Sequence, residues 1–185
     1  LINYQGDGTD MLVMAPGDDP TIRIDNAALP STDRATSNSL PTLEFSNVHT
    51  FLVDPSPSNA VTVTFVTAAL SGAGNYDTNL TAFDTLAIEG AVGLDDEYTV
   101  TVEPGSFVTV TDNNNVSGAV IRDVAYKSSA GRLQINTFDG NDVININDAM
   151  LIPVTVDMGS PTGPLDADIL NMLMPQESSV ELSAV

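Results

Sequence analysis

The chain contains no cysteine and no tryptophan, and only 5 of its 185 residues are Lys or Arg. Without cysteine, disulfide bonds, thiolate catalysis and the common zinc cages are excluded. The 25 acidic residues leave a net charge of -20, which argues against nucleic acid and anionic membrane surfaces as partners, because both attract clustered positive charge. No apolar run approaches the ~18 residues of a membrane span, so we expect no membrane insertion.

A signal peptide is not recognisable, and the chain starts at Leu1 without a methionine. We therefore expect it to be a processed or trimmed piece of a longer precursor. The acidic balance suits a protein surrounded by cations. It serves either to bind them specifically or to keep the protein soluble in a salty medium.

Short runs rich in Val, Thr and Ile recur along the whole chain, separated by Gly, Pro, Asn and Asp. This pattern is typical of strands joined by turns. The runs are 11–14, 21–24, 42–45, 50–53, 61–66, 84–89, 98–103, 107–111, 119–126, 132–136, 142–147 and 152–157. Helical periodicity is weak, and the best helix candidate is 164–174, with Asp166 as its cap. We predict an all-β fold.

A longer period is superimposed on the strands. The matching segments are TDMLVM (9–14) with FDTLAI (83–88), GDDPTIRI (17–24) with LDDEYTVTV (94–102), and DADILNM (166–172) as a third start. We predict two degenerate repeats, 1–79 and 80–163, followed by the start of a third repeat or a tail, 164–185. The predicted architecture is a parallel β-solenoid of short strands, with tandem antiparallel β-sandwich repeats as the alternative.

Glycine and aspartate combine just before several of these strands, as in QGDGTDMLV (5–13) and TFDGNDVIN (137–145). Glycine permits a positive φ, which exposes carbonyl oxygens at a corner, and a nearby Asp adds its carboxylate. Ca²⁺ prefers such mixed oxygen ligands. The alternative is that these are ordinary turns in which Asp caps its own backbone. The candidate calcium ligands are Asp7, Asp10, Asp139, Asn141 and Asp142, with weaker candidates Asp19, Asp84, Asp96 and Asp168.

These windows resemble the hemolysin-type (RTX-like) calcium-binding nonapeptide, G-G-x-G-x-D-x-U-x. In 5–13 the positions of Gly6, Gly8, Asp10 and Leu12 match and the first glycine is replaced by Gln5, whereas 137–145 keeps only the later Gly, the Asp and the apolar residue. That family stacks its nonapeptides in tandem, whereas no two copies are adjacent in this chain. The residue pattern of the longer repeat is similar to that of the degenerate repeats in large bacterial cell-surface proteins of the planctomycete and marine type. The resemblance implies Ca²⁺ and an extracellular or cell-surface location.

Signals for catalysis are weak, and no catalytic or cofactor-binding residue is assigned. His49 is the only histidine, no G-x-S-x-G nucleophile motif occurs, and no phosphate-binding Gly loop with Lys is present. The expected function is a non-enzymatic structural or adhesive module, stabilised by calcium, in an array, filament or surface layer. We expect homotypic contacts through the chain ends, Leu1-Ile2 and 178–185, because open strand edges template pairing. The alternative is a calcium-dependent polysaccharide-active enzyme or its accessory domain, and a surface polysaccharide is the second partner considered.

Overall fold

The computed structural model describes residues 1–55, 59–81, 83–103, 107–114, 120–123, 131–148, 152–160 and 167–173. These residues form two eight-stranded sheets and one turn of 3-10 helix, η1 (Thr67–Ala69), with no α-helix among them. The all-β prediction is confirmed at the level of fold class. Within these ranges no helix is long and apolar enough to cross a membrane.

Hydrogen bonding sets the order of the strands across each sheet. From edge to edge, the first sheet contains β1 (Ile2–Gln5), β5 (Leu43–Ser46), β4 (Asp33–Ser37), β3 (Thr21–Asn26), β7 (Thr62–Val66), β9 (Thr85–Glu89), β13 (Arg132–Asn136) and β15 (Val154–Asp157). The second contains β16 (Ile169–Met172), β14 (Val143–Ile146), β10 (Glu97–Glu103), β11 (Phe107–Asp112), β12 (Val120–Asp123), β8 (Ala73–Thr78), β6 (Val48–Val53) and β2 (Met11–Met14).

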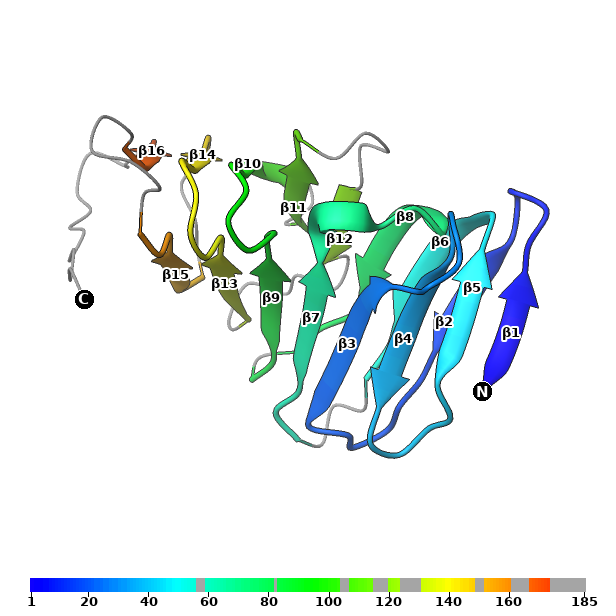
Figure 1. Cartoon of the computed structure of the whole chain (residues 1–185). Helices are drawn as coiled ribbons and strands as arrows, with labels where there is room; N and C mark the ends of the chain where they lie inside the picture. Colours follow the sequence, from blue (N-terminus) through cyan, green and yellow to red (C-terminus); the bar gives the residue numbers. More distant parts are fainter. Residues whose placement is uncertain are drawn as a thin grey trace.

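The chain passes back and forth between the two sheets, which form two layers (Figure 1). Most neighbouring strands are therefore parallel, because each return to a sheet repeats the same direction. Antiparallel pairing among the described strands is confined to β3–β4–β5 in the first sheet and β10–β11–β12 in the second. Each sheet therefore contains both parallel and antiparallel pairs, and the two sheets face each other as in a sandwich. The predicted solenoid would contain parallel pairs alone, and the predicted sandwich repeats would contain antiparallel pairs alone.

One hydrophobic core lies between the sheets, built from alternate residues of their strands. In β7 the side chains of Val63 and Phe65 are buried and the intervening threonine is partly exposed, as the period of two requires. Aromatic rings join the layers. Phe45 of β5 stacks on Phe51 of β6 with ring centroids 4.2 Å apart, and Phe65 meets Tyr76 of β8 edge-on. The core therefore extends through both predicted repeats without a break.

The prediction of a helix at 164–174 is wrong, because Ile169–Met172 form strand β16. This strand pairs in parallel with β14, and the backbone bonds gained there outweigh a weak local helical preference. Three further strands, β1, β4 and β8, lie where the sequence has no continuous β-branched run. Residues 161–166, including Asp166, and the tail 178–185 lie outside the described residues.

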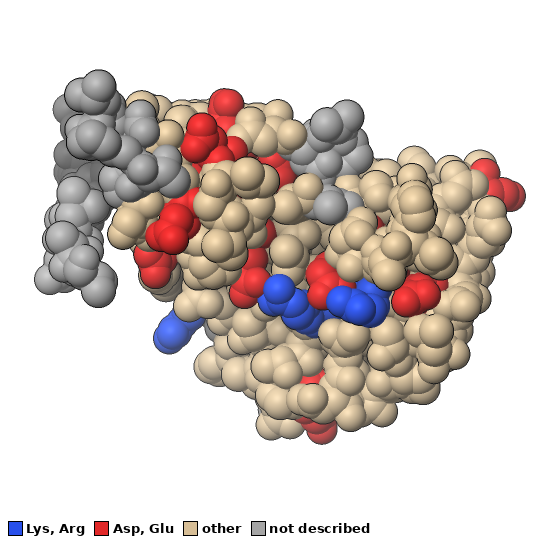
Figure 2. Space-filling view, viewed as in Figure 1, with Lys and Arg blue, Asp and Glu red and all other residues tan. Residues whose placement is uncertain are grey.

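Acidic groups outnumber basic ones on the face seen in Figure 2, where the basic side chains gather near the middle beside acidic atoms. Three of the arginines form ion pairs on the described surface. These pairs are Arg23–Glu89, Arg34–Asp25 and Arg122–Asp77, with N–O distances of 2.7, 2.9 and 2.8 Å. The most exposed of these pairs, Arg23–Glu89, adds little stability.

Candidate functional site

The predicted strand-opening aspartates lie where the chain crosses from one sheet to the other. Asp10, Asp84, Asp96, Asp142 and Asp168 each stand immediately before the first residue of a strand, namely β2, β9, β10, β14 and β16. Asp19 stands before Pro20 and β3 in the same way. Asp19, Asp84, Asp96 and Asp142 are buried, which is unusual for carboxylates and requires partners.

Backbone N–H groups are the main partners of these carboxylates. Asp84 accepts hydrogen bonds from the N–H of Thr81 at 2.6 Å and from the N–H of Val61, immediately before β7, at 2.9 Å. Asp10 accepts from the N–H of Asp7 at 2.9 Å, and Asp7 accepts from the N–H two residues further along the turn. Asp7, Asp10 and Asp84 therefore cap their own turns, which is the role that the simpler sequence interpretation gives them.

Three of the strand-opening aspartates form a ladder across β10, β14 and β16. The N–H of Asp96 donates to Asp142 Oδ1 at 2.9 Å, and the N–H of Asp142 donates to Asp168 Oδ1 at 3.1 Å. The carboxylates of Asp142 and Asp168 thus each accept from the equivalent residue of the neighbouring strand. Repulsion accompanies this arrangement, because the three side chains carry the same charge and two of them are buried.

The glycine of the 137–142 turn has a different role from the one predicted. Positive φ occurs at Gly8, but at Phe138 rather than Gly140 in the second turn. A Cβ on Gly140 would lie 2.1 Å from the carbonyl oxygen of Leu94 in the adjoining turn. Glycine is required at this position because two backbones approach each other closely, and not because the backbone adopts a left-handed conformation there.

Several oxygens in this turn are buried without a hydrogen-bond partner among the described residues. They are Thr137 Oγ1, Asn141 Oδ1 and Asp142 Oδ2. The backbone N–H of Asn141 donates to Asp95 Oδ1 at 2.9 Å, which brings a further carboxylate to the turn. Burial raises the pKa of the Asp142 carboxyl and the charges of Asp168 and Asp95 add to the rise, whereas the Thr137 side chain and the Asp96 N–H lower it. Unpaired buried oxygens next to a carboxylate are suitable ligands for a hard cation.

A small cavity of about 90 Å³ lies beside the same turns. Its lining includes the side chains of Asp95, Asp96, Asp112 and Asn114. Burial raises the pKa of Asp96 to about 7, and the carboxylates of Asp142, Asp112 and Asp95 contribute, although the N–H of Ala91 opposes the shift. Asp95 and Asp112 were not among the candidate metal ligands predicted from the sequence. Asp112 reaches this corner only because β11 returns antiparallel to β10.

The remaining predicted ligands do not converge. Asp7 and Asp10 lie beside β2 and the 139–142 turn lies beside β14, toward opposite ends of the second sheet, so one ion cannot join them. Asp139 is exposed, whereas Asn141 and Asp142 lie deeper. In the described part of the chain no three acidic or histidine side chains are grouped closely enough to hold a metal by themselves. A cation at Asp142 would therefore need hydroxyl, amide or backbone oxygens as well.

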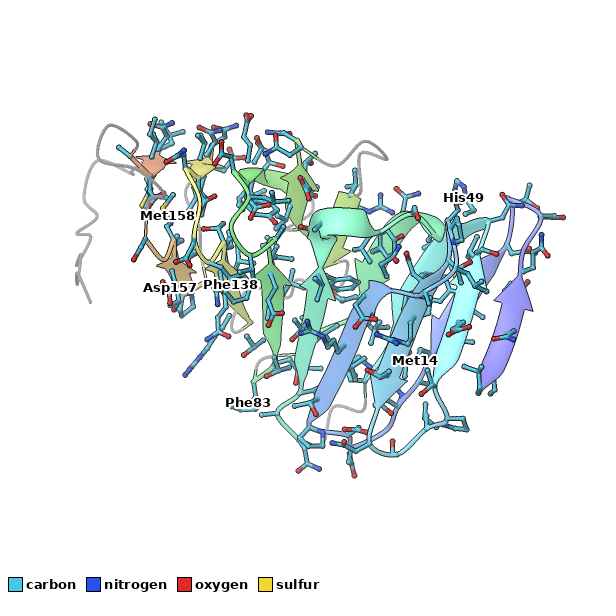
Figure 3. The ribbon with its side chains drawn as sticks, in the orientation of Figure 1. Met14, His49, Phe83, Phe138, Asp157 and Met158 are labelled. Carbon is cyan, nitrogen blue, oxygen red and sulfur yellow. The ribbon has the colours of Figure 1, made fainter. Side chains whose placement is uncertain are left out.

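Another buried carboxylate, that of Asp33 at the start of β4, was not among the predicted site residues. It accepts hydrogen bonds from the N–H groups of Ser71 at 3.0 Å and Gly72 at 2.8 Å, and from the hydroxyl of Tyr76. Burial raises the pKa of Asp33, while these donors lower it. The group links the two sheets and has a structural role. By contrast, the lone His49 projects outward from β6 into solvent (Figure 3).

Comparison of the chain with protein-family models, with curated proteins and with solved structures finds no match. The resemblance to RTX-like repeats therefore stays a prediction, and function must be inferred from the site itself.

Proposed function

We propose that the chain is a non-enzymatic structural or adhesive module of an extracellular or cell-surface assembly, stabilised by calcium and built for self-association. The observation that carries the proposal is the repetition of acids at equivalent corners. A structural module needs the same cap at each return of the chain, whereas an enzyme needs one unique set of groups in a cleft.

The topology supports a repeat architecture for this module. The antiparallel unit β3–β4–β5 of the first sheet has a counterpart, β10–β11–β12, in the second, and the strands before and after each unit also exchange sheets. We infer that the repeats 1–79 and 80–163 are two units of a short, largely parallel solenoid, each of which passes between the sheets several times and contains one antiparallel excursion. Such repeats bury their ends only against neighbours, which favours a role in an array.

Calcium is proposed at the 137–142 turn, where Asp142 Oδ2, Asn141 Oδ1 and Thr137 Oγ1 would be its ligands. A bound cation would neutralise repulsion between the Asp96, Asp142 and Asp168 carboxylates. At a calcium concentration a hundred times the Kd, binding would add about 2.7 kcal/mol to the free energy of unfolding.

Removal of calcium tests this proposal. EDTA should lower the melting temperature, and NaCl at equal ionic strength should not restore it. Asp142→Asn should weaken the response to calcium, while Asp18→Asn, which removes an exposed charge outside the turn, should not. A melting curve that is the same in EDTA and in calcium would refute calcium stabilisation.

The alternative, a calcium-dependent polysaccharide-active enzyme, requires an acid and a base in one cleft. A cavity of about 310 Å³ on the outer face of β3 and β4 holds Arg23 among Thr, Ser and Asn side chains, without a carboxylate in its lining. If the protein releases reducing ends from acidic or neutral polysaccharides, this result would favour the enzyme over the structural module.

A further inference from the structure

Both ends of the double-layered structure are open among the described strands. β1 and β2 form the edges at one end, and β15 and β16 form the edges at the other (Figure 1). Large apolar side chains are exposed at both ends. They are Ile2, Met11 and Val13 at the first end and Ile169, Met172 and Leu173 at the second. Exposed apolar edges of this kind favour pairing with another strand.

The directions of the edge strands determine which partner fits. In the first sheet only β4 is reversed, and in the second only β11, so β1 runs parallel to β15 and β2 runs parallel to β16. A second copy placed beyond the end would therefore continue both sheets with the parallel pairing used inside. A partner related by a twofold axis would instead bring identical edges together antiparallel.

The two edges of the second sheet also share a sequence pattern. Asp10-Met11-Leu12-Val13-Met14 and Asp168-Ile169-Leu170-Asn171-Met172 both read Asp-x-Leu-x-Met. Leu12 and Met14 face inward on β2, and Leu170 is the partly buried partner of the core residue Ile144. If Asp10 of one copy lies beside Asp168 of the next, its carboxylate can accept the Asp168 N–H, as Asp168 accepts from Asp142.

Backbone hydrogen bonding agrees with this register. The Asp10 carbonyl accepts from the N–H of Thr50 in β6 at 3.1 Å, and the Met14 carbonyl accepts from the N–H of Asp54, just after β6, at 2.9 Å. By alternation the backbone groups of Val13 therefore face the open edge. At the other edge the Ile169 N–H donates to the Asp142 carbonyl and the Leu173 N–H donates to the Ile146 carbonyl, both at 2.8 Å. The backbone groups of Leu170 therefore face outward. The register brings the Val13 N–H to the Leu170 carbonyl. A slip of one residue would oppose groups that already have partners and would reverse the apolar faces.

We propose that copies of this chain stack head to tail, with β2 of one copy paired in parallel with β16 of the next, and β1 with β15, in the register that places Asp10 beside Asp168. The inference rests on the self-association in the proposed function and specifies its geometry. A stack of this kind does not close on itself and gives a filament.

The lack of cysteine in the sequence allows a direct test by disulfide formation. Val13 and Asn171 are exposed and would be register partners, about 5 Å apart between Cα atoms, which suits a disulfide. Val13→Cys and Asn171→Cys proteins, mixed and oxidised, should form a mixed dimer, and each alone should form little. Predominant dimers of one variant alone would indicate a twofold contact and overturn the inference.

Sedimentation of the unmodified chain separates the two proposals. A monomer at high concentration would refute self-association altogether, whereas oligomers without mixed disulfides would refute only the head-to-tail register. Val13→Pro removes the outward N–H and leaves the bonds to β6 in place, so it should raise the dissociation constant at least roughly tenfold. Val13→Thr keeps the N–H and should assemble as the unmodified chain does. Equal assembly of both variants would contradict pairing through this edge.

Discussion

Replacing Asp96 by Asn should remove much of the dependence of stability on pH between 5 and 8. In the folded chain the Asp96 carboxyl has a pKa of about 7, against an ordinary value of 3.8, chiefly because the side chain is buried. At a pH between these two pKa values, the Asp96 carboxyl is protonated in the folded state and ionised in the unfolded state. The free energy of unfolding therefore falls as pH rises, and the contribution is fully present only below about pH 4.

The magnitude follows from the two pKa values. One pH unit of displacement corresponds to about 1.4 kcal/mol, so the whole effect is on the order of 4 kcal/mol, of which about 3 kcal/mol should be lost between pH 5 and pH 8. Asparagine does not ionise, yet its carbonyl oxygen can still accept the bond that Ala91 N–H gives to Asp96 at 3.0 Å. Its amide can also donate to the neighbouring carboxylates of Asp112 or Asp142.

The change in the free energy of unfolding between pH 5 and pH 8 is measured by urea unfolding in the presence of EDTA, with circular dichroism as the signal. EDTA is needed because a bound cation would favour the ionised carboxyl. The Asp96→Asn variant should lose clearly less stability than the unmodified chain over this interval, and Asp18→Asn should match the unmodified chain. Equal losses in all three proteins, or a gain of stability toward pH 8 in the unmodified chain, would refute the reasoning.

Two further substitutions test the packing of the corners. Tyr76→Phe removes the hydroxyl that donates to buried Asp33, so chemical denaturation at pH 7 should show a loss of about 1–3 kcal/mol; an unchanged denaturation midpoint would mean that other donors suffice. Gly140→Ala should lower the melting temperature by more than the same substitution at Gly17, which has a positive φ but open space around it, because the new methyl group would meet the Leu94 carbonyl. Similar effects at both glycines would contradict the close approach of the two turns.

The local pattern of the chain was sufficient to predict the fold class and most of the strands. Alternation of apolar and polar residues has a period of two wherever one face of a strand is buried, so runs such as 61–66 can be recognised without their partners. The positions of Asp10, Asp84 and Asp96 at strand starts could also be predicted, because an Asp that caps a turn interacts with backbone close to it in sequence.

Only the tertiary structure decided which strands pair and which carboxylates share a corner. Pairing depends on groups far apart in sequence, as when β16 becomes a strand because β14 lies beside it. The burial of Asp33 against Tyr76, and the approach of Asp112 to Asp96, likewise arise where the chain returns from another part of the fold. Glycine at 140 looks like a turn residue in the sequence, but the Leu94 carbonyl that requires it lies in a neighbouring turn 46 positions earlier, a contact that no local pattern encodes.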